Sequence, residues 1–244
     1  MAATTKPLVV ITGASSGIGE ACAKVFAGLG HPLLLLARRV ERMEALKLGD
    51  SVLCRKVDVC DREALNAAVK EAEAKFGPTD LMINNAGVMQ LASITEQKPE
   101  EWYAMIDVNM KGVLHGMQAV CGQMAAREGG TIVNVSSVAG RKNFPNHVAY
   151  CGTKFGVHAM SEGLREELAA KNVRVIRIAP GAVETELLSH TTVDSIKAGY
   201  DAWKTQMGGV MTSEDIAESI RWAYSMPQRL TIREIVLTAT KQGP

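Results

Sequence analysis

Short runs of mostly apolar residues recur along the chain, separated by longer segments in which apolar residues lie three or four positions apart. Runs of this length that are apolar on both faces are typical of buried strands, and of parallel strands above all. The pattern therefore predicts a seven-stranded, mainly parallel sheet. The strands that we expect are residues 8–11, 33–37, 52–59, 81–84, 131–135, 173–178 and 232–237.

The longer segments between these runs have the apolar spacing of amphipathic helices. Gly77 and Pro78 are typical of a helix end, and Thr212 followed by Asp215 is typical of a helix start. Strands that alternate with helices in this way predict one doubly wound α/β domain over residues 1–244, with helices on both faces of the sheet. The helices that we expect are residues 18–29, 61–76, 99–127, 149–171 and 216–225.

The segment 184–209 is polar and less regular than the rest of the chain. It contains Gly199, Gly208 and Gly209. Long segments without secondary structure are uncommon in a single domain, and those that occur are often functional. We therefore expect this segment to form a mobile lid over a substrate site.

Composition and charge exclude several classes of protein. The chain has 244 residues and a formal net charge of +1, and it has no long basic run, so we expect no nucleic-acid partner. The five cysteines form no CxxC and the five histidines lack the spacing of metal ligands, so we expect reduced thiols and no metal. No apolar stretch is long enough for a membrane span or a signal-peptide core, and we expect a cytoplasmic protein with no membrane partner.

A glycine-rich turn, TGASSGIG, follows the first expected strand and opens the first expected helix. Glycines in such a turn let the backbone approach a pyrophosphate, and the amides at the helix start can donate to it. A glycine-rich turn alone also occurs in plain loops, but its place after an apolar strand favours a nucleotide. The candidate cofactor contacts in this turn are Gly13, Ser15, Ser16, Gly17, Ile18 and Gly19.

The end of the second expected strand carries two arginines where NAD-binding folds of this kind place a carboxylate. No Asp or Glu lies between Glu20 and Glu41, and Arg38 and Arg39 stand at the strand end instead. A guanidinium there can pair with a 2′-phosphate and stack on adenine. A solvated basic pair is the alternative. We expect NADP(H), with NAD(H) as the less favoured cofactor.

Tyr150 and Lys154 are four residues apart at the start of an expected helix, so they share one face. A free phenol, with a pKa of about 10, is a poor acid–base group at neutral pH, and a nearby ammonium lowers that pKa. Ser137 ends the fifth expected strand, at the edge of the sheet where such folds bind ligands. Its hydroxyl can hold a substrate oxygen while Tyr150 exchanges a proton.

Taken together, these motifs resemble the short-chain dehydrogenase/reductase family over essentially the whole chain. The resemblance implies a Rossmann-type fold and hydride transfer with a nicotinamide cofactor. Any one motif is modest support, but their common order and spacing are specific. Besides the glycine-rich turn, the matching elements are NNAG at 84–87, Asn109 in DVN, Ser137, YCGTK at 150–154 and PG at 180–181.

The resemblance implies a role for each matching residue. Tyr150 is the expected acid–base group, Ser137 is expected to hold the carbonyl oxygen, and Lys154 is expected to bind the nicotinamide ribose. Asn109 is expected to support a proton-relay water. Ser136 is the competing serine, but strand alternation turns it to the other side. The further expected cofactor contacts are Asp58 and Val59 at the adenine, Asn85, Ala86 and Gly87 near the adenosine ribose, and Pro180, Gly181, Val183 and Thr185 around the nicotinamide carboxamide.

One group of basic residues suits a small acidic substrate. The chain is similar to the branch of the family that oxidises 3-hydroxy acids or reduces small polar carbonyl compounds. A hydroxy acid is therefore the first substrate class that we expect, with a solvated basic loop as the plain alternative. The candidate side chains are Arg141, Lys142, His147, His190 and Lys204.

Other features leave different functions open. Leu187, Leu188, Tyr200 and Trp203 suit an apolar ketone. A 3-oxoacyl carrier-protein reductase or a steroid or retinoid reductase would carry the same motifs. A regulator that senses NADP(H) without turnover is a different class, and the proton donor Tyr150 argues against it. Through the resemblance, the long apolar helices imply a homodimer or a homotetramer.

Overall fold

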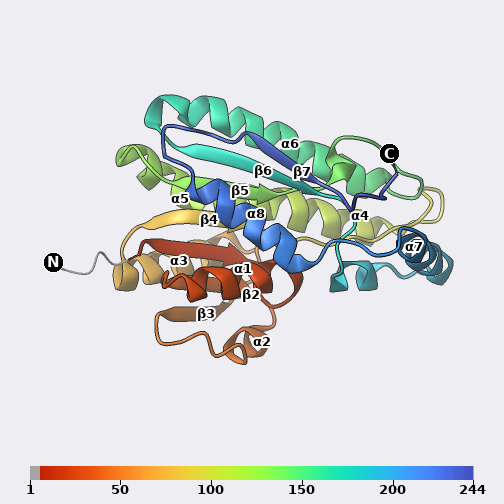
Figure 1. Cartoon of the computed structure of the whole chain (residues 1–244), viewed down its shortest axis with the longest axis horizontal. Coiled ribbons are helices and arrows are strands. Elements are labelled where there is room, and N and C mark those ends of the chain that lie inside the picture. Colours follow the sequence, from red (N-terminus) through yellow and green to blue (C-terminus); the bar gives the residue numbers. More distant parts are fainter. Residues whose placement is uncertain (1–5, 244) are drawn as a thin grey trace.

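The computed structural model describes residues 6–243 and shows one seven-stranded sheet (Figure 1). Its order is β3-β2-β1-β4-β5-β6-β7, and each of these pairings is parallel. The predicted mainly parallel sheet is therefore confirmed, while positions 1–5 and 244 of the predicted domain lie outside the described residues. The strands are β1 (Leu8–Thr12), β2 (Leu33–Ala37), β3 (Val52–Lys56), β4 (Thr79–Asn84), β5 (Thr131–Val135), β6 (Arg174–Pro180) and β7 (Glu234–Leu237).

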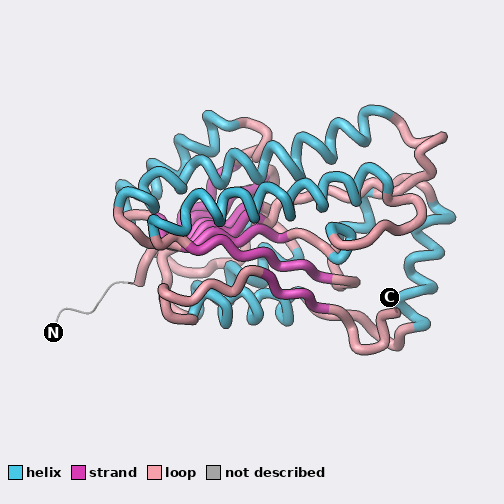
Figure 2. The backbone as a smooth tube through the Cα atoms, turned by 90° about the horizontal axis from the view of Figure 1, so that it is seen from above, coloured by secondary structure: helices cyan, strands magenta, loops and turns pink. Residues whose placement is uncertain are grey.

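Helices lie on both faces of this sheet, as Figure 2 shows. The helices are α1 (Gly17–Gly28), α2 (Val40–Glu44), α3 (Arg62–Phe76), α4 (Pro99–Ile106), α5 (Gly112–Ala126), α6 (Val148–Leu168), α7 (Asp194–Gln206) and α8 (Ser213–Ser225). Val9 and Ile11 belong to the core shared with α1 and α8, whereas Leu8 and Val10 belong to the core shared with α3, α5 and α6. Burial on both faces explains why the strands are almost wholly apolar.

Several elements differ from the prediction. The third strand ends at Lys56, so Asp58 and Val59 lie in the turn that follows it. Helices α2 and α7 were not predicted. The segment 184–209 was expected to be irregular, but it holds a 3-10 turn, Glu186–His190, and half of it is α7. No residue of α7 is fully buried, and the mobility of the segment stays a prediction.

A π-helical turn, η1 (Asp107–Lys111), interrupts the helix predicted over residues 99–127. It joins α4 to α5 and widens the helix locally without breaking it. Asn109 lies in this turn and is buried. The prediction is therefore right about the extent of the helix and wrong about its regularity, because one wide turn barely disturbs the apolar spacing on either side.

Within residues 6–243 we find no helix that is both long enough and apolar enough to cross a membrane. Over the same range, no group of three or more His, Cys, Asp or Glu side chains is arranged to hold a metal ion. The five cysteines all lie in this range as free thiols, and two of them, Cys22 and Cys151, are buried.

Candidate functional site

A cavity of about 680 Å³ opens at the carboxyl ends of the parallel strands, the edge at which doubly wound folds bind their ligands. Nearly all the residues proposed from the sequence lie on its wall. Gly19 and Asn109 are the exceptions, since both are buried beneath it. The proposed residues on the wall are Gly13, Ser15, Ser16, Gly17, Ile18, Arg38, Arg39, Asp58, Val59, Asn85, Ala86, Gly87, Ser137, Tyr150, Lys154, Pro180, Gly181, Val183 and Thr185.

The glycine-rich turn is held against the loop that follows β4. Gly13 has a φ of +66°, and a Cβ there would lie 2.8 Å from the Cα of Ala86, so only glycine suits this position. The Thr12 hydroxyl accepts hydrogen bonds from the backbone N–H groups of Asn85 and Ala86, at 3.0 and 3.1 Å. The Asn85 amide donates to the carbonyls of Thr12 and Gly13. Asn85 therefore braces the turn.

The start of α1 offers backbone amides to the cavity. Ser16 is the N-cap residue, but its hydroxyl makes no capping hydrogen bond to the helix. The first N–H groups of a helix have no partner within it, and Gly17 and Ile18 line the cavity here. A helix start with uncapped N–H groups is a binding place for phosphate.

Arg39 crosses from the end of β2 to the glycine-rich turn. Its guanidinium donates to the hydroxyl of Ser16 at 2.9 Å and to that of Ser15 at 3.4 Å. It also donates to Glu186 at 2.9 Å, and Arg42 of α2 donates to the same carboxylate at 2.8 Å. The sequence predicted Arg39 at the end of the second strand, but it gave no sign of Glu186, because only the fold brings the segment after β6 to the end of β2.

Ser137 and Tyr150 meet beyond the end of β5. Tyr150 lies near the start of α6 and is only 5% exposed. Burial raises the pKa of its phenol, while a hydrogen bond with Ser137 lowers it. Ser137 also accepts a hydrogen bond from the Ala139 N–H at 3.0 Å, which fixes its side chain. Ser136 instead donates to the Lys154 carbonyl at 3.3 Å, so Ser137 is the serine whose hydroxyl lies beside the phenol.

Lys154 lies one helical turn after Tyr150, and its side chain is buried. Its Nζ donates to the Val135 carbonyl at 3.1 Å and lies 5.7 Å from the centre of the Tyr150 ring. Burial lowers the pKa of Lys154 to about 8. The sequence predicted that this ammonium lowers the pKa of Tyr150, whereas in the structure burial dominates and the pKa of the phenol is raised.

Asn109 links the π-turn to two neighbouring segments. Its amide oxygen accepts the Val88 N–H at 2.8 Å, and its amide nitrogen donates to the Val88 carbonyl at 2.9 Å. The same nitrogen donates to the Thr153 hydroxyl at 3.1 Å, and Thr153 donates to the Tyr150 carbonyl at 2.8 Å. The Asn109 side chain thus fixes the loop after β4 and the helix that carries Tyr150.

The loop after β6 is fastened by the C-terminal segment. Gln242 Oε1 accepts the Ala182 N–H at 3.0 Å, and a Cβ on Gly181 would overlap the Gln242 amide. Gln242 also lines the cavity. Val183 pairs with Met211 in an isolated parallel bridge. Sequence reasoning did not select Gln242, because its partners lie far away in the chain and only the sheet brings them together.

Aromatic side chains line the part of the cavity beside Tyr150. Tyr200 and Trp203 of α7 pack edge to face, with ring centres 5.3 Å apart. Phe144 and His147 lie on the loop before α6, with ring centres 5.6 Å apart. The His147 ring lies 6.2 Å from the Tyr150 ring, and burial lowers the pKa of His147, which keeps it neutral. This part of the cavity therefore offers mainly flat apolar surface.

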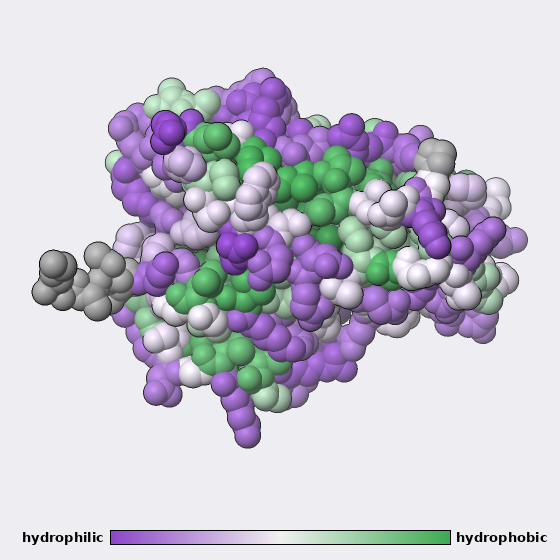
Figure 3. All heavy atoms as spheres, in the orientation of Figure 1, coloured by the Kyte–Doolittle hydropathy of each residue, from purple (hydrophilic) through white to green (hydrophobic). Residues whose placement is uncertain are grey.

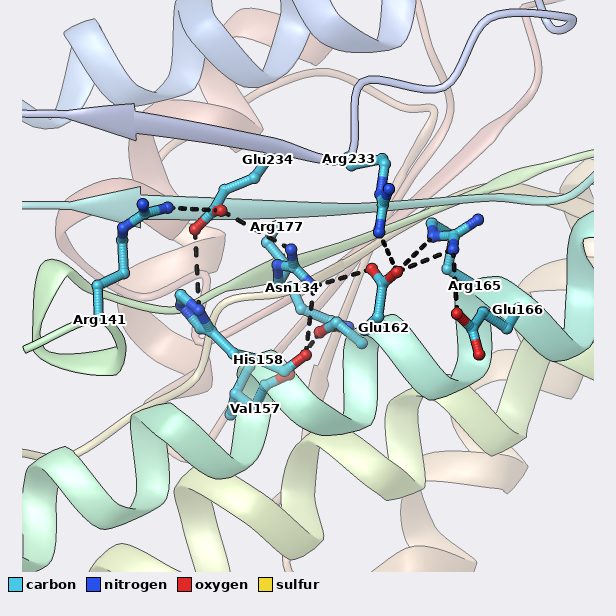
Figure 4. A network of polar contacts seen from close by, with 11 residues as sticks. Asn134, Arg141, Val157, His158, Glu162, Arg165, Glu166, Arg177, Arg233 and Glu234 are labelled. Carbon is cyan, nitrogen blue, oxygen red and sulfur yellow. Dashed lines mark hydrogen bonds and ion pairs between the residues drawn. The ribbon is translucent and has the colours of Figure 1, made fainter.

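Two of the basic residues proposed for an acidic substrate, Arg141 and Lys142, do not line the cavity. Arg141 donates to Glu234 of β7 at 2.7 Å, and Figure 4 shows this pair beside His158 of α6. The Lys142 Nζ lies over the Phe144 ring, 4.9 Å from its centre. The structure therefore gives no support to the predicted contact of Arg141 and Lys142 with a substrate.

Lys204 and His190 do line the cavity. Lys204 donates to Glu184 at 3.2 Å and forms an ion pair with Asp201 at 3.1 Å. Burial and the nearby arginines after β2 lower the pKa of His190, so it is neutral at pH 7. Of the predicted basic set, Lys204 is the side chain that brings a positive charge to this part of the cavity, and two carboxylates already offset it.

The family model for short chain dehydrogenase matches residues 7–195. The chain belongs to the short-chain dehydrogenase family. This short-chain dehydrogenase is also 40% identical over 241 residues to an uncharacterized oxidoreductase of Staphylococcus saprophyticus, and the match covers 97% of each chain. The family predicted from the motifs is thereby confirmed.

Two solved structures resemble this short-chain dehydrogenase over nearly its full length. One is the closed form of a serine dehydrogenase complexed with NADP+, with a TM-score of 0.90 and 31% identity, covering 97% of this chain and 96% of the other. The second is an alcohol dehydrogenase from the archaeon Thermococcus sibiricus complexed with 5-hydroxy-NADP, with a TM-score of 0.85 and 28% identity, covering 98% and 99%. Both confirm the predicted Rossmann-type fold.

Proposed function

We propose that this short-chain dehydrogenase interconverts a small alcohol and its aldehyde or ketone with NADP(H). The observation that carries the proposal is the meeting of Ser137, Tyr150 and Lys154 on the wall of the same cavity as the glycine-rich turn. Reduction of a carbonyl needs a positioned proton donor, and a protein that only binds a nucleotide does not. When bound, the nicotinamide supplies or accepts the hydride.

The groups around the glycine-rich turn fit a dinucleotide that carries a 2′-phosphate. The uncapped N–H groups of α1 suit its pyrophosphate. Arg38 and Arg39 suit the 2′-phosphate, because guanidinium groups bind phosphate through charge-assisted hydrogen bonds. The NADP-containing structures that resemble this chain support the same choice, with NAD(H) as the weaker cofactor. The residues proposed as further contacts are Asp58, Val59, Asn85, Ala86, Gly87, Pro180, Gly181, Val183 and Thr185.

Tyr150 is the proposed proton donor to the substrate oxygen. Its raised pKa keeps the phenol protonated at neutral pH, which suits the reduction direction. Ser137, whose side chain lies beside this phenol and lowers its pKa, is proposed to donate to the same oxygen and so to stabilise the charge that develops there. Lys154 is proposed to hold the nicotinamide ribose, and Asn109 to support a relay water that returns the proton to Tyr150.

Two substrate classes fit the part of the cavity beside Tyr150. A small hydroxy acid and its carbonyl product come first, because Lys204 lies on that wall and a similar solved structure is a serine dehydrogenase. An uncharged ketone or aldehyde is the second candidate, because Tyr200 and Trp203 present apolar surface and Glu184 already pairs with Lys204.

A substrate panel tests the proposed function. Aldehydes, ketones and oxo acids are assayed with NADPH, and alcohols and hydroxy acids with NADP+, by absorbance of the reduced cofactor. We expect turnover of at least one small carbonyl compound, with higher efficiency for NADPH than for NADH. Lys204→Met should lower kcat/KM for acids and spare uncharged substrates if the first class is right. Tight NADPH binding without any turnover would contradict the proposal and favour a regulator that senses NADP(H).

Exposed apolar side chains support an assembly of identical subunits. Figure 3 shows apolar surface over β7, where Val236 is exposed. Patches of this kind on a folded chain often mark subunit contacts. We propose a homodimer or a homotetramer, which light scattering after gel filtration tests; a monomer would contradict it. Further exposed apolar side chains on α4, α5 and α6 are Tyr103, Ile106, Leu114, Val148 and Phe155.

A further inference from the structure

One carboxylate, that of Glu186, is shared by two arginines beside the glycine-rich turn. Arg39 donates to its Oε2 at 2.9 Å, and Arg42 donates to its two oxygens at 2.8 and 3.0 Å. The hydrogen bonds from Arg42 and from Arg39 lower the pKa of Glu186, so the carboxylate is ionised at neutral pH. The guanidinium proposed for the 2′-phosphate therefore already has an anionic partner from the chain itself.

The backbone around Glu186 is anchored, so its carboxylate stays near the arginines even when an ion pair opens. Thr185 packs against the start of α1, where a Cβ on Gly17 would lie 3.2 Å from the Thr185 methyl group. At the other end of the 3-10 turn, the Thr191 hydroxyl accepts the Leu91 N–H at 3.2 Å. A phosphate that approaches Arg39 thus meets a nearby negative charge that cannot move far.

The ion pairs themselves are open to solvent. The side chains of Arg39, Arg42 and Glu186 are 44%, 46% and 48% exposed. Ion pairs at this exposure contribute little to stability, whereas a phosphate carries up to two charges and binds guanidinium groups strongly. Arg39 can therefore exchange the carboxylate for a phosphate, but the repulsion between the two anions opposes this exchange.

We propose that Glu186 is a specificity-determining residue that competes with the 2′-phosphate of NADP(H) for Arg39, and so limits the preference of the protein for NADP(H) over NAD(H). The inference rests on the proposed cofactor for the identity of its ligand. The proposal predicts that removal of the Glu186 carboxylate strengthens the binding of NADP(H) and leaves the binding of NAD(H) unchanged. If Glu186 instead held Arg39 in place for the phosphate, its removal would weaken the binding of NADP(H).

Binding measurements on Glu186→Gln test this proposal without a substrate. Dissociation constants of NADPH, NADH, 2′,5′-ADP and 5′-AMP are measured by calorimetry for the wild type and the variant. We expect NADPH and 2′,5′-ADP to bind roughly two- to fivefold more tightly to the variant, the size of effect typical of an exposed charge pair. NADH and 5′-AMP should bind unchanged, which also shows that the variant is folded.

Glu41→Gln is the matched control. Glu41 lies on α2 with Arg42 and forms no ion pair among residues 6–243, so its loss removes a nearby charge but not the competing partner, and we expect no change. Unchanged or weaker NADPH binding to Glu186→Gln, or equal tightening of NADH, would overturn the proposal. Wild-type protein that binds NADH as tightly as NADPH would instead overturn the proposed cofactor preference, so the two failures are distinct.

Discussion

The Lys154 ammonium donates to the carbonyl of Val135 across 3.1 Å, which ties α6 to the end of β5. Both residues are buried, and burial lowers the pKa of Lys154 to about 8. A charged group in such a place destabilises the fold, because desolvation disfavours its ionised form. Buried groups with shifted pKa values are common where a fold positions reactive groups, and Tyr150 lies one helical turn away.

The first prediction follows from this burial. Lys154 has a pKa lowered from 10.5 to about 8 in the folded chain, so between these pH values the unfolded chain binds more protons and stability rises with pH. Lys154→Met lacks this contribution. The free energy of unfolding of the wild type should therefore rise relative to the variant, by up to roughly 3 kcal/mol over that range.

Chemical denaturation of both proteins across this pH range measures the effect. Because other groups titrate in both proteins alike, the difference between them isolates Lys154. A difference that does not change with pH would show that the folded-state pKa of this lysine is not lowered.

A second prediction concerns the close packing of α5 on β4. A Cβ at Gly116 would overlap the Asn84 side chain and lie 2.7 Å from the Met82 Cε. Gly116→Ala should destabilise the fold by roughly 1–3 kcal/mol, the usual cost of overpacking a core. Gly122→Ala on the same helix meets open space and should stabilise by about 0.5–1 kcal/mol. Thermal and chemical denaturation compare the two, and effects of the same sign would contradict this packing.

A third prediction joins the C-terminal segment to the proposed cofactor site. Gln242→Ala removes the acceptor of the Ala182 N–H, and Gly181→Ala displaces the same side chain. Each substitution should weaken NADPH binding by about 1 kcal/mol, the typical net contribution of one hydrogen bond. The double variant should bind NADPH no more weakly than either single variant, because both substitutions act through the same contact. Calorimetric titration measures all three, and additive losses would refute a shared origin.

Much of the fold was predictable because its signals are local. The strands at the centre of the sheet are buried and mostly apolar, and Asp61 caps α3. The Thr212 and Asp215 side chains form the predicted capping box of α8. Ser137, Tyr150 and Lys154 were also found from spacing, since a strand end and one helix face fix where they lie.

Other features depend on contacts that no local pattern reports. The π-turn around Asn109 leaves the flanking apolar spacing almost intact. Glu186 follows β6 but pairs with Arg39 at the end of β2, and Gln242 follows β7 but accepts from Ala182 after β6. Both therefore reach their partners only after the sheet has formed. Arg141 was a candidate for binding an acidic substrate because it follows Ser137 closely in sequence. In the structure, however, its guanidinium pairs with Glu234 of β7.

Tyr150→Phe tests whether the Tyr150 hydroxyl gives its proton to the substrate oxygen. The variant keeps the buried ring but loses this hydroxyl. With a carbonyl substrate from the panel, kcat should fall by about 10²–10⁴-fold, the usual contribution of a general acid, while the dissociation constant of NADPH stays close to that of the wild type. Near-normal turnover by this variant would contradict the role of Tyr150 as the proton donor.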